Sequence, residues 1–226
     1  PTRRSSDLDV VQLGKVENRL STPLESELAY DLIVLDGASI ESKMGSIIVQ
    51  ADYHGSSEAP YANDGIDPDP NAIGVVRLGG TLKAAQAVTL RGTSGNDAFE
   101  FGGGFQIDTP KLELLLGDGD DSLTLSGAIS VPTFRIDAGA GNDTITVLDT
   151  AQMTSTALIE IDLGAGDDFL SLAGSFSAPT LVFGGGAGND SFSLAAGMVA
   201  TAGTSIEFQL GDGNDTLTAA GSFAAP

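Results

Sequence analysis

Six aspartates recur from residue 97 onward, and each one closes a short glycine-rich stretch. They are Asp97, Asp121, Asp143, Asp168, Asp190 and Asp215, separated by 24, 22, 25, 22 and 25 residues. Carboxylate oxygens are ligands that calcium prefers, and main-chain carbonyls can complete such a site. Glycine reaches positive φ without steric cost, which suits a turn where carbonyls converge. The residue types and their spacing therefore point to repeated cation-binding turns.

Alternating apolar residues lie on both sides of each turn and predict the strands that position it. Five and three residues before the second position of each motif stand Val88 and Leu90, Leu112 and Leu114, Phe134 and Ile136, Ile159 and Ile161, Leu181 and Phe183, and Ile206 and Phe208. Two residues after each motif aspartate stand Phe99, Leu123, Ile145, Leu170, Phe192 and Leu217. A period of two indicates strands with one buried face.

A unit of 22 to 25 residues cannot enclose a core by itself, but stacked units can. Each unit offers a strand, a Gly-Asp turn, a second strand and a third side with one or two apolar residues. The connections are too short for helices, so successive coils should pair in parallel, with right-handed winding as the default. The sequence predicts an all-β fold over residues 88–226. We expect a right-handed parallel β-helix or β-roll-like solenoid with its Gly-Asp turns stacked on one edge.

The charge of the chain favours the same chemistry. The 226 residues carry a net charge of −21, and from residue 92 onward eighteen acidic residues face two basic ones, Lys111 and Arg135. Such a surface repels nucleic acid and anionic lipid and attracts cations. Carboxylates stacked about 5 Å apart repel by roughly 1 kcal/mol in water and by about 3 kcal/mol at an effective dielectric near 20. A divalent cation between them would turn that repulsion into attraction.

The motif resembles the calcium-binding repeats of RTX, or haemolysin-type, proteins. Residues 185–193 read GGAGNDSFS and fit G-G-x-G-x-D-x-U-x, with U a large apolar residue, at every fixed position. The other copies are less regular and read GTSGNDAFE, GDGDDSLT, GAGNDTIT, GAGDDFLS and GDGNDTLT. The chain departs from the usual β-roll, whose coil holds two nonapeptides, because each coil here holds one motif. The turns should therefore line one edge of the solenoid and not both.

The resemblance implies Ca²⁺ ions between adjacent coils, held by motif aspartates and by carbonyls of the glycine-rich turns. The implied metal-site residues are Asp97, Gly117, Gly119, Asp121, Gly139, Gly141, Asp143, Gly164, Gly166, Asp168, Gly186, Gly188, Asp190, Gly211, Gly213 and Asp215. Further ligand candidates directly precede the motif aspartates and are Asp120, Asn142, Asp167, Asn189 and Asn214. The alternative is that Asp and Asn only shape the turns, with water screening the charge.

The remaining parts of the chain are read separately. Residues 1–8, PTRRSSDL, resemble the translation of a sequencing adapter and are expected to add nothing to the fold. Residues 9–87 form an irregular, β-rich part that can supply further β-helix coils, with an acidic loop at 52–72. The solenoid is expected to be truncated at its C-terminal end, so the chain reads as a fragment of a longer protein.

The leading functional hypothesis is a non-enzymatic, calcium-stabilised segment of a large secreted or cell-surface bacterial protein such as an adhesin, with cell-surface or matrix ligands as partners. No nucleic acid partner is expected, and no apolar run is long enough to span a membrane. The alternative is a repeat domain attached to a secreted lyase, epimerase, protease or lipase. His54 is the only histidine, and no G-x-S-x-G or H-E-x-x-H occurs. A further alternative is ice binding by the Ser/Thr rows, which Phe169, Ala98 and Glu100 interrupt.

Overall fold

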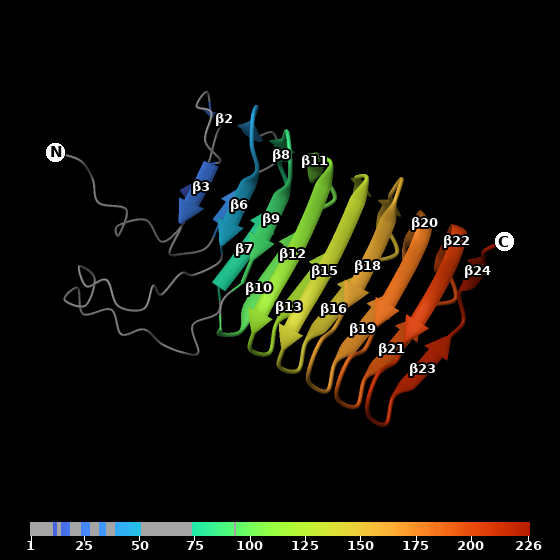
Figure 1. Ribbon diagram of the computed structural model, residues 1–226. Coiled ribbons are helices and arrows are strands. Elements are labelled where there is room, and N and C mark those ends of the chain that lie inside the picture. Colours follow the sequence, from blue (N-terminus) through green and yellow to red (C-terminus); the bar gives the residue numbers. More distant parts are fainter. Residues whose placement is uncertain are drawn as a thin grey trace.

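A computed structural model describes residues 11–12, 15–18, 24–27, 32–34, 39–50, 74–92 and 94–226. These residues form 24 strands that pair in parallel into three sheets, stacked as a β-solenoid (Figure 1). The described residues contain no helix long and apolar enough to cross a membrane. The predicted all-β parallel solenoid is confirmed. The adapter-like segment 1–8, the acidic loop 52–72 and His54 lie outside the described residues.

Sheet A follows the Gly-Asp turns and has nine strands in strict chain order. They are β1 (Val11–Gln12), β4 (Leu32–Val34), β7 (Gly74–Leu78), β10 (Asp97–Phe101), β13 (Ser122–Leu125), β16 (Thr144–Val147), β19 (Phe169–Leu172), β21 (Ser191–Leu194) and β23 (Thr216–Ala219). Sheet A begins before the repeat region that the sequence predicted to start at residue 88. It has no break there, because β7 pairs with both β4 and β10.

Sheet C precedes the turns, and its long strands from β12 onward are the most prominent elements of Figure 1. Eight strands of sheet C lie on this side of the solenoid. They are β3 (Leu24–Glu27), β6 (Ile47–Gln50), β9 (Val88–Arg91), β12 (Lys111–Asp118), β15 (Thr133–Ala140), β18 (Leu158–Asp162), β20 (Ser175–Gly184) and β22 (Val199–Gln209). The Gly-Asp turns connect sheet C to sheet A and form a row along the lower edge of Figure 1. The sequence predicted this single row.

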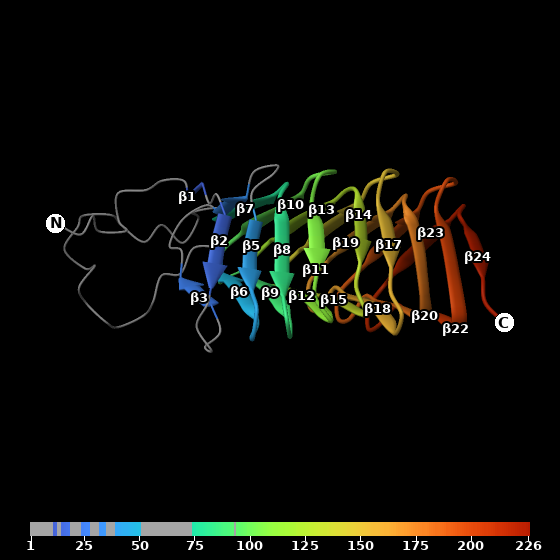
Figure 2. The ribbon, with the colours of Figure 1, turned by 90° about the horizontal axis from the view of Figure 1, so that it is seen from above.

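The strands on the third side of the solenoid belong to one sheet in the first coils and to another in the later coils. In the first coils it is sheet B, with β2 (Lys15–Asn18), β5 (Ser39–Ser42), β8 (Thr81–Ala84) and β11 (Gln106–Asp108). In later coils it consists of β14 (Ala128–Ser130), β17 (Gln152–Thr154), the first residues of β20 and β22, and β24 (Ser222–Ala224). Strand β11 lies beside β14, so the side is continuous in Figure 2. The later strands belong to sheet C because β20 and β22 run through the corner.

The apolar columns predicted from the sequence form the core. In sheet C, Leu114, Ile136, Ile161, Phe183 and Phe208 pair in register from coil to coil. The first four are fully buried, and Phe208 is partly buried and stacks on Phe183 with ring centroids 5.1 Å apart. In sheet A, Phe99, Leu123, Ile145, Leu170 and Phe192 form the matching column. The solenoid is therefore filled by one continuous apolar core.

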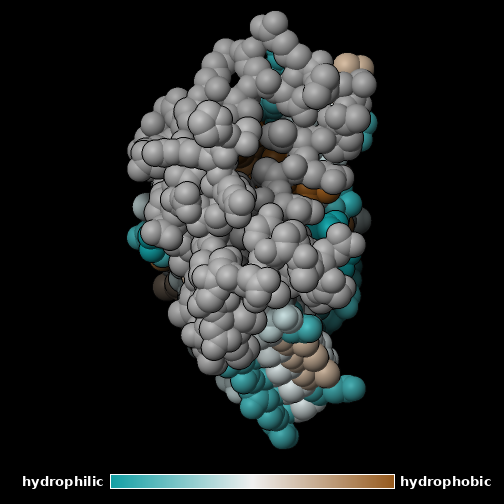
Figure 3. Space-filling model, turned by 90° about the vertical axis from the view of Figure 1, so that its left-hand side faces the viewer, coloured by the Kyte–Doolittle hydropathy of each residue, from teal (hydrophilic) through white to brown (hydrophobic). Residues whose placement is uncertain are grey.

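The last coil of the described solenoid differs from the middle coils. In the last coil, Leu217 and Phe223 are 40% and 42% exposed, although their counterparts one coil earlier are buried. Figure 3 shows the molecule from the left-hand side of Figure 1, where hydrophilic residues and smaller hydrophobic patches are visible around the grey ones. The middle coils, between Asp97 and Asp190, therefore give the clearest view of the turn geometry.

Candidate metal centre at the Gly-Asp turns

The turns need glycine at the second and fourth motif positions. All ten glycines at these positions, from Gly117 to Gly213, have φ between 94° and 146°, a region that disfavours residues with a side chain. The coils also approach each other closely here. A Cβ on Gly141 would overlap the carbonyl oxygen of Gly119, and a Cβ on Gly166 would overlap that of Gly141. Glycine thus serves both the backbone conformation and the coil-to-coil contact.

Main-chain hydrogen bonds join each turn directly to the next. Gly141 N donates to Ala165 O over 2.8 Å, and Ala165 N donates to Gly139 O over 2.8 Å. The same pattern joins the following coils, where Gly166 N donates to Ala187 O. The turns therefore continue the parallel pairing of the strands around the corner of the solenoid.

The motif aspartates form an inner column along this row of turns. Asp97, Asp121, Asp143, Asp168 and Asp190 are 1–2% exposed. From Asp121 to Asp215, one carboxylate oxygen of each motif aspartate, Oδ1, accepts a hydrogen bond from the main-chain N–H of the motif aspartate one coil earlier. The pairs are Asp97 N to Asp121 (2.7 Å), Asp121 N to Asp143 (2.7 Å), Asp143 N to Asp168 (2.7 Å), Asp168 N to Asp190 (3.0 Å) and Asp190 N to Asp215 (2.9 Å). Each aspartate thus fastens its own coil to the preceding one.

The residues directly before the motif aspartates form an outer, exposed column. Their side chains accept hydrogen bonds from the following coil, whereas the motif aspartates accept them from the preceding coil. Here the side-chain oxygen accepts from the main-chain N–H of the following coil, as Asn96 Oδ1 does from Asp120 N (2.9 Å) and Asn142 Oδ1 from Asp167 N (2.8 Å). Asn142 and Asn189 also donate their Nδ2 to the carboxylates of Asp120 and Asp167. The further ligand candidates of the sequence are therefore occupied by a hydrogen-bond ladder in this structure.

In four aspartates of the inner column the second carboxylate oxygen has no hydrogen-bond partner. This holds for Oδ2 of Asp121, Asp143, Asp168 and Asp190, all of which are buried. None of these four side chains takes part in an ion pair among the described residues. Burying a carboxylate oxygen without a partner is costly, so these four atoms require a proton or a cation.

Burial shifts the titration of the same groups. It raises the pKa of Asp121 to about 8, that of Asp168 to about 7 and that of Asp143 to about 6. It also raises the pKa of Asp190. The hydrogen bond from the preceding coil opposes the rise, and neighbouring carboxylates add to it. Without a cation, Asp121 and Asp168 therefore hold a proton over part of the range near neutral pH.

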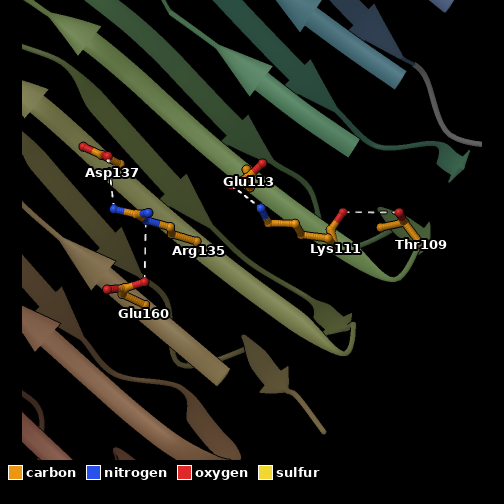
Figure 4. Close-up of polar contacts among 6 residues, drawn as sticks. All are labelled: Thr109, Lys111, Glu113, Arg135, Asp137 and Glu160. Atoms are coloured by element: carbon orange, nitrogen blue, oxygen red, sulfur yellow. Dashed lines mark hydrogen bonds and ion pairs between the residues drawn. The ribbon is translucent and has the colours of Figure 1, made fainter. Parts of the chain in front are cut away.

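The two basic residues from residue 92 onward, Lys111 and Arg135, lie on another face. Figure 4 shows them on the outer side of sheet C, where Lys111 Nζ contacts Glu113 Oε1 (2.7 Å). Arg135 lies between Asp137 (3.4 Å) and Glu160 (3.5 Å). Both basic residues are thus paired with acidic residues of sheet C and do not neutralise the aspartate column.

The donor set of the turns fits a divalent cation in its chemistry. It combines buried, unpartnered Oδ2 atoms with glycine carbonyls, and oxygen ligands of both kinds suit Ca²⁺. The carbonyls of Gly139, Gly164 and Gly186 already accept main-chain hydrogen bonds from the next coil. Among the described residues, no three His, Cys, Asp or Glu side chains gather closely enough to hold a metal ion. Main-chain carbonyls would therefore have to supply most of the ligands.

The structure brings the predicted site residues together along one edge, but sequence reasoning missed the burial of the aspartates. The signal was present, because Asp97 has the same parity as Phe99 and Phe101 in β10 and so faces the core with them. Compared with models of known families, with curated proteins and with solved structures, the chain shows no significant match.

Proposed function

We propose that this chain is a non-enzymatic, calcium-stabilised solenoid segment of a large secreted or cell-surface bacterial protein that acts as an adhesin. The carrying observation is the column of buried Oδ2 atoms in Asp121, Asp143, Asp168 and Asp190, which have no hydrogen-bond partner. The repeated RTX-like motif and the net charge of −21 support the same proposal. The inner-column aspartates and the turn glycines, through their carbonyls, would hold the ions.

A bound Ca²⁺ would supply two positive charges to an edge that has none of its own. The protein contributes the rest: in Asp121, Asp143, Asp168 and Asp190, Oδ1 stays on the main-chain N–H of the preceding coil, and Oδ2 remains available. The glycines keep the turns free of side chains that would block the approach of an ion. Because the column exists only when adjacent coils are stacked, binding adds to the stability of the folded state.

This linkage suits a protein that acts outside the cell. Extracellular calcium modules bind with dissociation constants of about 10⁻⁴ to 10⁻³ M. A chain with such sites would be less stable in a low-calcium cytosol, because the buried aspartate column then has no cation to neutralise it, and would gain stability after export. The folded solenoid is then a rigid stalk that presents its flat faces to cell-surface or matrix ligands.

Calorimetric titration of the full chain with calcium, and with magnesium as a control ion, tests the proposal. We expect saturable calcium binding with dissociation constants of about 10⁻⁴ to 10⁻³ M and weaker magnesium binding. Asp143→Asn should lower the number of calcium ions bound, while Glu160→Gln, on the outer face of sheet C, should leave it unchanged. No saturable binding, or equal loss in both variants, would contradict the proposal.

A further inference from the structure

The acidic charge of the solenoid is confined to part of its surface. The outer side of sheet C carries acidic residues such as Glu113, Asp137 and Glu160, and the row of turns carries the aspartates. In contrast, the outward positions of β13, β16, β19, β21 and β23 in sheet A hold no charged residue. A chain with a net charge of −21 thus keeps the outer face of these five strands neutral. The row that holds Thr124 continues into Glu100 of β10 and Arg77 of β7, which form an ion pair at the edge of the neutral face.

Two rows of residues cover this neutral face, which we term the hydroxyl face. The parallel register places them side by side: one row is Ser122, Thr144, Phe169, Ser191 and Thr216, and the other is Thr124, Thr146, Ser171, Ser193 and Thr218. Only Ser122 among these hydroxyls makes a hydrogen bond within the described residues, a long one of 3.5 Å to Asp97 O. The other hydroxyls are free to bind an external partner.

One large apolar residue interrupts the hydroxyl face. Phe169 is 40% exposed and stands between Thr144 and Ser191 on the neighbouring strands. A single exposed apolar residue is ordinary on a protein surface. Here, however, the ring is surrounded by uncharged hydroxyl groups on a regular sheet, so the face offers an apolar contact and many hydrogen-bonding groups together.

We propose that the hydroxyl face binds a neutral polysaccharide. Covering hydroxyl groups is costly unless the partner supplies donors and acceptors in return, which sugar hydroxyls do. The CH-rich face of a sugar ring can lie against the Phe169 ring, because aromatic side chains bury large apolar areas. An anionic polymer is disfavoured by the field of the acidic chain. The protruding Phe169 ring disfavours ice, whose surface is flat and offers no apolar group.

This inference gives the adhesin part of the proposed function its partner and rests on that part, but not on calcium. The test measures depletion of the full chain from solution by insoluble cellulose and starch, with cross-linked polygalacturonate as the anionic control and an array of neutral glycans alongside. The wild-type protein should bind at least one neutral glycan and should not bind polygalacturonate. Thermal hysteresis is recorded in parallel to detect ice binding.

Two variants locate the binding to the face. Phe169→Ser removes the ring, and Ser171→Glu places a charge in the second row, so each should weaken binding by roughly tenfold or more. Ser177→Glu is the matched control on the third side, where Ser177 also points outward, and should bind like wild type. Circular dichroism and melting of each variant show that the fold is kept.

Each outcome decides the proposal. It is overturned if the wild type binds no neutral glycan, if it binds polygalacturonate equally well, if Phe169→Ser and Ser171→Glu bind like wild type, or if the chain shows ice binding alone. Polysaccharide binding without any calcium response would leave this inference intact and refute the calcium proposal. A calcium response without glycan binding would support the calcium proposal and overturn this inference.

Discussion

The main-chain N–H of Asp121 donates a 2.7 Å hydrogen bond to Oδ1 of Asp143, which lies one coil further along the solenoid. The same bond recurs at every step of the inner column, so each motif aspartate satisfies a buried N–H of its neighbour. The bond occupies one oxygen and leaves the other, Oδ2, without a partner. The aspartates therefore have a structural role, and their second oxygen is the atom that the proposed calcium ion would use.

These two roles can be separated at Asp168. Asp168→Ala removes the acceptor of the Asp143 N–H and should destabilise the protein by about 1–3 kcal/mol, the cost of an unsatisfied buried donor. Asp168→Asn keeps an acceptor oxygen and removes the buried charge, so it should be the milder change without calcium. Urea unfolding in chelator measures both. Equal losses of stability in the two variants would show that the hydrogen bond accepted by Asp168 does not account for its contribution to stability.

Without calcium, the stability of the fold should depend on pH in an unusual direction. The pKa values of Asp121, Asp143 and Asp168 are raised from 3.8 to about 8, 6 and 7. Groups whose pKa is higher in the folded state favour folding while they hold a proton. Their contribution is fully present below pH 3.8 and is lost as the pH rises through the range from about 6 to about 8.

Thermal melts in chelator at pH 5 and pH 8 (either side of the raised values, about 6 to 8) check this dependence. The melting temperature should be lower at the higher pH. A double variant, Asp121→Asn with Asp168→Asn, should flatten the profile because two of the titrating groups are gone. A melting temperature that rises over the same interval in the wild type would show that the column is ionised at no cost in the folded state.

The turn glycines should be intolerant of side chains. Gly166→Ala forces a residue with a Cβ to a φ of 146° and places that Cβ against Gly141 O. Strain of this kind costs of order 1–3 kcal/mol before the overlap is counted. Gly197→Ala is the matched control, because a Cβ there would meet nothing within 4 Å. Chemical unfolding of both variants compares them, and equal stability would contradict the close packing of the turns.

The sequence predicts the architecture well because the apolar residues alternate on both sides of every turn. Ile136 and Ile161 stand at equivalent places in their repeats, and the structure pairs them in register. The direction of the aspartate hydrogen bonds could not be predicted, because an equal repeat lies on each side and the side chain can reach either. The sheet membership of the third side could not be predicted either. Its later strands belong to sheet C because the long strands β20 and β22 run from the third side into that sheet.

The most direct test of the account is thermal melting of the full chain, followed by circular dichroism, in chelator and in 5–10 mM calcium, about five to ten times the weakest expected dissociation constant, near 10⁻³ M. Magnesium at the same concentration serves as the control. We predict a clear rise in melting temperature and a gain of β-structure with calcium, because the ion binds only the stacked turns. Identical spectra and melting temperatures in chelator and in calcium would contradict the account and leave the Gly-Asp turns as architecture alone.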